Sequence, residues 1–377
     1  MAAATVPAVG HGSSSARVSL FFYLVLIVYG SWYPFSGWEN RGLSPQALLL
    51  APLPHYWTLF DVVTNVLAYL PFGLLVVFAL YPRVRGPRAA LLAIVAGTLL
   101  TAAMEAGQTL LPNRVPSNLD LLTNALGACL GAGAGVLLTR PFLEQSRLLA
   151  LRRRWFVADA GRGLIVLALW PLAQIYPQGY VFGHGQITTA LSDWLSDWLA
   201  TPVDLAELLR RGVQPGIEQY WLAETIITAC GMTGAVLALL ILLRKQAPRG
   251  MLALTLVAAA VIVKTLASAL LFAPENAFKW LTPGAVGGLL VGALMLAGLT
   301  SARPLAQRRL AVATLAASLA IVNLMPSNPY FVATLQTWVQ GKFLNFNGAT
   351  QFLSLLWPFF MLWFLLHPAH RAKHAPA

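Results

Sequence analysis

Residues 61–80 read DVVTNVLAYLPFGLLVVFAL, and this apolar stretch decides the class of the fold. At 1.5 Å per residue, a helix of this length crosses about 30 Å, the thickness of the hydrocarbon core of a bilayer. Its polar side chains stand near its beginning, where Asp61 and Asn65 are one helical turn apart. We therefore expect a membrane-spanning helix with one polar end.

Similar runs recur along the whole chain. Hydrophobic residues make up 58% of the sequence, charged residues make up only 10%, and the mean hydropathy is +0.69. Such values are typical of a membrane protein. The sequence therefore predicts an all-α, polytopic transmembrane bundle of about ten helices. The expected helices lie near residues 18–36, 61–81, 89–111, 119–139, 162–182, 222–243, 251–273, 281–300, 310–325 and 350–367.

Basic residues gather in alternate connections between these runs. Arg83, Arg85 and Arg88 share one connection, and six arginines lie between residues 140 and 162, whereas the neighbouring connections carry few. The positive-inside rule then places both termini in the cytoplasm and the chain in the inner (cytoplasmic) membrane. This topology and contact with anionic membrane lipid explain the net charge of +12, so no nucleic-acid partner is expected.

Two polar signatures interrupt the apolar segments of the N-terminal part. They are Asp61-x3-Asn65-x5-Pro71-x-Gly73 and Glu105-x2-Gln108-x5-Arg114-x5-Asp120-x3-Asn124-x2-Gly127. Polar groups are costly inside a membrane, so their presence there indicates a function. We expect them to meet at the outer ends of their helices. The predicted substrate-binding pocket is lined by Asp61, Asn65, Glu105, Gln108, Arg114, Asp120 and Asn124.

Structural explanations stay open for the charged members of this set. Asp61 and Asp120 begin helices, where a carboxylate can cap free N–H groups. Glu105 is expected about 9 Å below the outer end of its helix. Arg114, in the proline-flanked loop above, could fold back to pair with Glu105, or it could grip a phosphate or carboxylate of a ligand.

The order and spacing of these residues resemble the VanZ-like family of integral membrane proteins, named for a teicoplanin-resistance protein. The resemblance covers roughly the first 140 residues. It implies a role in the cell envelope and an effect on susceptibility to glycopeptide antibiotics. It also divides the chain into a VanZ-like four-helix transmembrane module, residues 1–160, and a C-terminal six-helix transmembrane region, residues 161–377.

The chemistry of the pocket suggests a more general function. We predict that the pocket binds the polar head of an envelope lipid or of a cell-wall precursor. A membrane enzyme that modifies a lipid-linked substrate and a transporter of lipid or solute are the alternatives. No catalytic residue is assigned and no cofactor is expected, because the sequence shows no Ser-His-Asp set, phosphate loop or dinucleotide fingerprint.

Two further patterns concern helix packing. Gly127, Gly131 and Gly135 form a G-x3-G-x3-G stripe, which is expected to let a neighbouring helix approach closely. An offset of 162 or 163 residues carries Asp61 to Glu224 and aligns other features of the two halves. This offset suggests a parallel internal repeat, in which the second to fourth expected helices recur as the sixth to eighth.

The remaining polar outliers are interpreted as structural. Lys264 lies near the middle of an expected helix, where it could snorkel beside the bundle, serve a transport path or pair with Glu224, and we expect the pairing. His55 and His184 lie in outer loops, where single histidines are usually solvated, and neither has a second ligand for a metal ion. We therefore predict no metal site.

Overall fold

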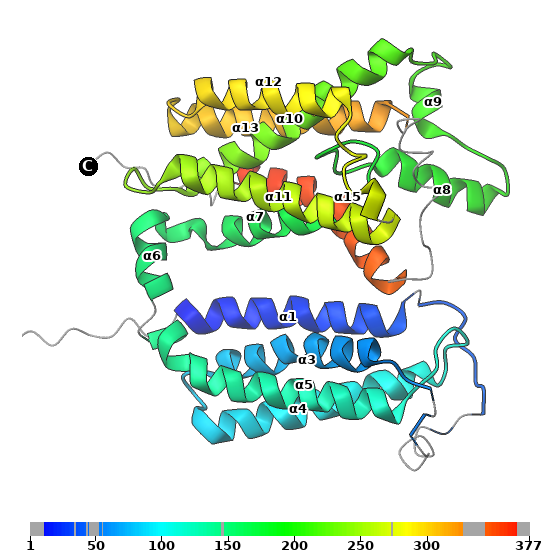
Figure 1. The fold of residues 1–377 in the computed structure, drawn as a ribbon, viewed down its shortest axis with the longest axis vertical. Helices are drawn as coiled ribbons and strands as arrows, with labels where there is room; N and C mark the ends of the chain where they lie inside the picture. Colours follow the sequence, from blue (N-terminus) through cyan, green and yellow to red (C-terminus); the bar gives the residue numbers. More distant parts are fainter. Residues whose placement is uncertain are drawn as a thin grey trace, which may run out of the picture. The chain divides into compact units, whose positions relative to one another are not determined.

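A computed structural model of the chain describes residues 11–33, 35–42, 44, 53–54, 56–144, 147–272, 274–326 and 344–367. These residues are nearly all helical (Figure 1). The α-helices are α1 (His11–Trp32), α3 (Leu59–Leu80), α4 (Gly86–Gln108), α5 (Asn118–Thr139), α6 (Arg147–Trp155), α7 (Gly161–Ala173), α8 (Ile187–Leu199), α9 (Leu205–Leu209), α10 (Ile217–Leu242), α11 (Arg249–Phe272), α12 (Pro283–Leu299), α13 (Pro304–Leu324) and α15 (Leu344–Leu366). A π-helical turn covers Arg140–Glu144, and 3-10 turns cover Ala158–Ala160 and Pro274–Asn276. His55 lies outside the described residues.

Seven helices in the described ranges are long and apolar enough to cross a membrane, namely α3, α4, α5, α10, α11, α13 and α15. Two shorter apolar helices are α12 and the part of α1 from Ala16 to Trp32. The prediction of an all-α, polytopic helix bundle is confirmed. The segment expected at residues 310–325 begins earlier, at Pro304, and so reaches a spanning length.

The segment expected to span at residues 162–182 is different. Helix α7 has 13 residues and is about 20 Å long, which is too short to cross the hydrocarbon core. Pro171 lies in its last turn, and Pro177 and three glycines follow, all of which disfavour a continued helix. The chain from residue 177 to residue 185 is non-helical and buried. His184 belongs to this stretch and is only 3% exposed, so the prediction of a solvated loop histidine was wrong.

The chain divides into two compact units, which we call unit 1 (Met1–Arg152) and unit 2 (Arg153–Ala377). In unit 1, α5 packs against α3 and α4, and α1 packs against α3. A Cβ atom added to Gly127 or Gly131 of α5 would run into the backbone carbonyls of Val66 and Leu70 in α3. The predicted glycine stripe therefore lies in the closest helix contact of unit 1 and fixes the distance between α3 and α5.

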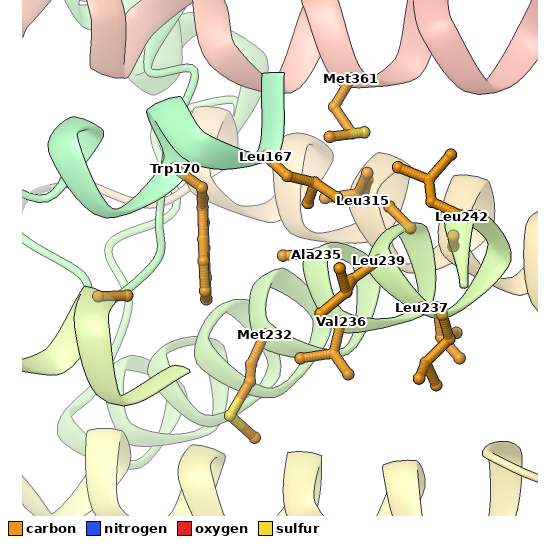
Figure 2. Packing of buried hydrophobic residues seen from close by; sticks show 14 of the residues in the cluster. Leu167, Trp170, Met232, Ala235, Val236, Leu237, Leu239, Leu242, Leu315 and Met361 are labelled. Carbon is orange, nitrogen blue, oxygen red and sulfur yellow. The ribbon is translucent and has the colours of Figure 1, made fainter. Parts of the chain in front are cut away.

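Helix α10 forms the centre of unit 2 and packs against α7, α11, α12 and α13. It is apolar and buried along most of its length, which is the pattern of a core helix. Figure 2 shows this core: Met232, Ala235, Val236, Leu237, Leu239 and Leu242 of α10 lie near Leu167 and Trp170 of α7, Leu315 of α13 and Met361 of α15.

The helix pairs α3–α5 and α10–α12 share one feature of packing. Gly288 and Gly292 of α12 lie against the backbone of α10, as Gly127 and Gly131 of α5 lie against that of α3. The third helices differ, because α4 packs on α5 whereas α11 packs mainly on α7. The predicted internal repeat therefore agrees with the packing of one helix pair, and the duplication itself stays a prediction.

Candidate functional site

The predicted pocket residues come from four elements of unit 1. Six of them belong to α3, α4 and α5, and Arg114 lies in the loop that joins α4 to α5. Asp120 interacts electrostatically with both Asp61 and Glu105, and it accepts a hydrogen bond from the side chain of Asn65. The structure therefore brings these carboxylates together where α3 and α5 begin and α4 ends.

Asp61 is engaged in capping α3. Thr58 is the N-cap residue, and its hydroxyl accepts a hydrogen bond of 3.1 Å from the backbone N–H of Asp61. The Oδ2 atom of Asp61 accepts hydrogen bonds from the backbone N–H and the hydroxyl of Thr58, at 3.2 and 2.7 Å. This reciprocal arrangement is a capping box, so the structural explanation for Asp61 is the one the geometry shows.

Glu105 holds the first turn of the next helix. Its Oε2 atom accepts a hydrogen bond of 2.8 Å from the backbone N–H of Ser117, the N-cap residue of α5. The Glu105 side chain is buried. Because α4 ends at Gln108, Glu105 lies only about 4.5 Å from the helix end, and the predicted depth of about 9 Å was wrong. The chain leaves the helix in tight turns from residue 109, which periodicity alone does not reveal.

The starts of α3 and α5 therefore use their carboxylates differently. In α3, the residue at the third helical position, Asp61, accepts the N–H of the cap residue. In α5 the equivalent N–H goes to Glu105, so Asp120 at the third position is not needed as its acceptor. Asp120 is half-buried and bonds to Asn65 of α3 instead. Asp120 is thus a carboxylate of the site that the cap of its own helix does not use.

Arg114 joins the α4–α5 loop to α1. Its Nη2 atom donates hydrogen bonds of 3.1 Å to the carbonyl oxygens of Gly30 and Tyr33, at the C-terminal end of α1. Burial lowers the pKa of the guanidinium, and the charge of Glu105 opposes this change. In the part of the chain that the structure describes, the two side chains do not form an ion pair within 4 Å, so the direct pairing that was one of the two alternatives is not observed.

The chain that follows α1 borders the same region. The backbone N–H of Glu39 donates to the carbonyl of Leu110 at 2.9 Å, and the Nη1 atom of Arg41 donates to the carbonyl of Leu111 at 3.3 Å. The indole N–H of Trp32 donates to the carbonyl of Met104 at 3.1 Å. These bonds hold residues 35–42 beside the last turn of α4.

A second polar layer lies deeper between the helices. The amide of Asn124 donates a hydrogen bond of 3.0 Å to the hydroxyl of Thr101, while its Oδ1 atom is buried without a partner. The buried hydroxyl of Tyr69 faces Thr101 and Glu105 but makes no hydrogen bond of good geometry. Neither Tyr69 nor Thr101 was among the predicted pocket residues, although each stands four residues from one of them, Asn65 or Glu105, on one helical face.

Gln108 is the least constrained of the predicted residues. It is half-buried in the last turn of α4, and its side chain makes no hydrogen bond to any described residue.

Across the described ranges, no three His, Cys, Asp or Glu side chains lie close enough together to hold a metal ion. Hydrogen-bond acceptors, above all carboxylate oxygens, therefore dominate the chemistry of the site.

Comparison with known proteins agrees with this division of the chain. Residues 20–139 match the family model VanZ/LLP1. The matched range contains all seven predicted pocket residues together with α3, α4, α5 and most of α1, and it includes no residue of unit 2. No curated protein and no solved structure matches the chain significantly. The predicted resemblance is thus confirmed for residues 20–139, which are similar to the VanZ/LLP1 family, and the apolar helices of spanning length make the chain a multi-pass membrane protein.

Proposed function

We propose that unit 1 binds the polar head of an envelope lipid or of a cell-wall precursor, where α3 and α5 begin. The observation that carries this proposal is the carboxylate of Asp120. It is half-buried beside two other carboxylates, and the cap of its own helix does not require it as acceptor for the Ser117 N–H. A partly desolvated carboxylate that its own helix cap does not use, and that bonds only to the Asn65 amide, can accept further hydrogen bonds from a ligand.

The balance of donors and acceptors indicates the kind of head group. The carboxylate of Asp120 supplies acceptor oxygens, and the buried Oδ1 atom of Asn124 supplies another acceptor one turn further along α5. The nearest cation, Arg114, already donates to two carbonyls of α1. The site therefore favours a head group with N–H or O–H donors, such as the ammonium of an ethanolamine lipid or the amines and hydroxyls of a precursor sugar or peptide.

The location of the site in the cell follows from the charge pattern. With basic connections on the cytoplasmic side of the inner membrane, the starts of α3 and α5 face outward. A protein that holds a cell-wall precursor there would change how much of it is exposed to glycopeptide antibiotics. An effect on antibiotic susceptibility is therefore a consequence of the proposed binding and not a separate activity.

Lipid retention tests this proposal. The full-length protein is placed in nanodiscs of equal parts phosphatidylethanolamine, phosphatidylglycerol and phosphatidylcholine, and native mass spectrometry identifies the lipid it keeps. The wild type should retain phosphatidylethanolamine over phosphatidylcholine, whose head has no N–H donor. Asp120→Asn should reduce this preference about tenfold, the effect of losing roughly 1.4 kcal/mol of a charge-assisted hydrogen bond.

A matched variant controls for net charge. Asp193 is an exposed carboxylate of α8 in unit 2, so Asp193→Asn removes the same charge away from the site and should keep the wild-type preference. The same comparison is repeated with a lipid-linked cell-wall precursor added to the discs. If the wild type shows no preference for either donor-bearing head, or if Asp120→Asn keeps it in full, the proposal is wrong.

A further inference from the structure

A second polar cluster lies inside unit 2, where α7 ends. Helices α7 and α15 pack against each other, α11 packs on α7, and the buried non-helical residues 177–185 follow α7 (Figure 1). This backbone is held by side chains of other helices. Thr228 of α10 donates to the carbonyl of Val181 at 3.1 Å, and Asn323 of α13 donates to that of Gly185 at 2.8 Å. The cluster is therefore built into the fold of unit 2.

His184 is the centre of this cluster. The amide of Gln174 lies 2.5 Å from its Nε2 atom, and the amide of Gln178 lies 2.8 Å from its Nδ1 atom. Trp357 of α15 packs edge-to-face with the ring, with centroids 5.6 Å apart. Burial, and to a smaller extent the charge of Lys264, lowers the pKa of His184 to about 3. The imidazole is therefore neutral at physiological pH.

A neutral imidazole has one donor nitrogen and one acceptor nitrogen, so only one of the two amides can donate to it. Gln174 is that donor, because its Nε2 atom also donates to the carbonyl of Trp170 at 3.2 Å. The side-chain oxygen of Gln178 then accepts a hydrogen bond from the Nδ1–H group of His184. The NH₂ group of Gln178 has no hydrogen-bond partner in this arrangement. Whichever way the Gln178 amide faces, one of its buried polar atoms has no protein partner.

Lys264 of α11 supplies a positive charge that interacts electrostatically with His184. The side chain is only 4% exposed, and its charge acts on the His184 ring. The predicted partner is not there: Glu224 accepts from Thr282, and no described acidic side chain lies within 4 Å of Lys264. A buried ammonium is costly unless a negative group compensates it.

We propose that this cluster is a binding site for a small anionic group, a carboxylate or a phosphate, held by Lys264 and the amide of Gln178. The charge of the described groups around it supports an anion, because Lys264 is the only ionised one among Lys264, His184, Gln174, Gln178 and Ser354. The buried Nε1 atom of Trp170, also without a partner, adds a donor to this part of unit 2. The group belongs either to a free anion or to the head of an anionic lipid.

Thermal unfolding of the full-length protein in a neutral detergent tests the free anion. Acetate or inorganic phosphate is titrated against chloride at equal ionic strength, and the melting temperature is followed by tryptophan fluorescence. A ligand that binds only the folded state should raise the wild-type melting temperature by about 3 °C relative to chloride. Lys264→Met should abolish the increase, whereas Lys279→Met, which removes an exposed lysine of the same unit, should keep it.

A second measurement tests the lipid source. Native mass spectrometry of the protein from phosphatidylglycerol and phosphatidylcholine nanodiscs should show phosphatidylglycerol retained by the wild type and lost in Lys264→Met, if the anion is a lipid phosphate. Lys264→Gln, which keeps a polar side chain, should behave as Lys264→Met does and replaces it if that variant does not fold. Asp120→Asn should change neither result, which separates this site from the one in unit 1.

The melting temperature and the lipid retention of the wild-type protein are enough to contradict the proposal. If neither anion raises its melting temperature above that in chloride, and it retains phosphatidylglycerol no better than phosphatidylcholine, the cluster does not bind an anion. An equal temperature increase in wild type and in Lys264→Met would place the anion elsewhere on the molecule and would also contradict the proposal.

Discussion

The charged side chains of the two units are partnered differently. In unit 1, Asp61, Glu105 and Arg114 bond to backbone atoms at helix ends. In unit 2, Gln174 and Gln178 each have a buried side-chain oxygen without a hydrogen-bond partner. Lys264 has no acidic partner among the described residues. A charged residue in an apolar segment is therefore not in itself a sign of a ligand site, since the carboxylates that stand out most in the sequence are partly structural.

The largest expected effect concerns the helix contact that positions the site of unit 1. A Cβ atom at Gly131 would collide with the carbonyl of Leu70, so Gly131→Ala should destabilise the fold by about 3 kcal/mol. Gly133 is the matched control, because a Cβ atom there meets nothing within 4 Å. Thermal unfolding of both variants should show a lower melting temperature for Gly131→Ala only. Equal melting temperatures would mean that α3 and α5 are not held this closely.

The second-largest effect is the dependence of the stability of unit 2 on pH. The pKa of His184 falls from 6.5 to about 3 on folding, mainly because of burial. Between these values the unfolded chain binds a proton that the folded chain does not, so stability is lost as the pH falls below 6.5. From pH 7 to pH 5 the loss should be about 2 kcal/mol. In His184→Gln, which cannot titrate, the loss should be smaller by that amount, and an unchanged pH profile would contradict the buried neutral histidine.

A third prediction separates the charge of Glu105 from its role as an acceptor. Glu105→Ala should cost about 1.5 kcal/mol, because it leaves the N–H of Ser117 without its acceptor. Glu105→Gln keeps an oxygen at the same place and should unfold near the wild-type temperature. Chemical unfolding of both variants measures the difference. If the glutamine variant is as unstable as the alanine variant, the bond to Ser117 is not what Glu105 contributes.

The smallest effect is expected at the start of α3. Asp61→Ala removes the acceptor half of an exposed capping box and should lower stability by about 0.5 kcal/mol. Hydrogen exchange of the amides in the first turn of α3 should become faster, while exchange at the start of α5 stays the same. Faster exchange at both helix starts would show that the two caps are coupled.

Much of the fold could be predicted from the sequence, because apolar runs of spanning length leave few alternatives in a membrane. The exception is α7, where Pro171 and the glycines after it end the helix and the following chain is buried by other helices. That burial depends on residues far away in the sequence, such as Asn323. The periodicity of the sequence does not show this burial, and the sequence therefore predicts His184 in a solvated loop.

The sequence could predict which helical faces carry the polar side chains of the candidate site, but it could not predict the role of each side chain. Spacing of four residues placed Asp61 with Asn65 and Asp120 with Asn124 on common helical faces. Which carboxylate caps which helix depends on the contact between Glu105 and Ser117, 12 residues apart across a loop. Local patterns cannot show such a contact, so capping and binding stayed open for each acidic residue.

The central claim is that Asp120 serves a ligand while Asp61 serves a helix end. Lipid retention from the mixed nanodiscs, measured side by side for Asp61→Ala and Asp120→Asn, tests it most directly. We predict that Asp61→Ala keeps the wild-type preference for phosphatidylethanolamine and that Asp120→Asn, although folded, loses it. A folded Asp61→Ala that loses the preference as fully as Asp120→Asn, or an Asp120→Asn that keeps it, would contradict the claim.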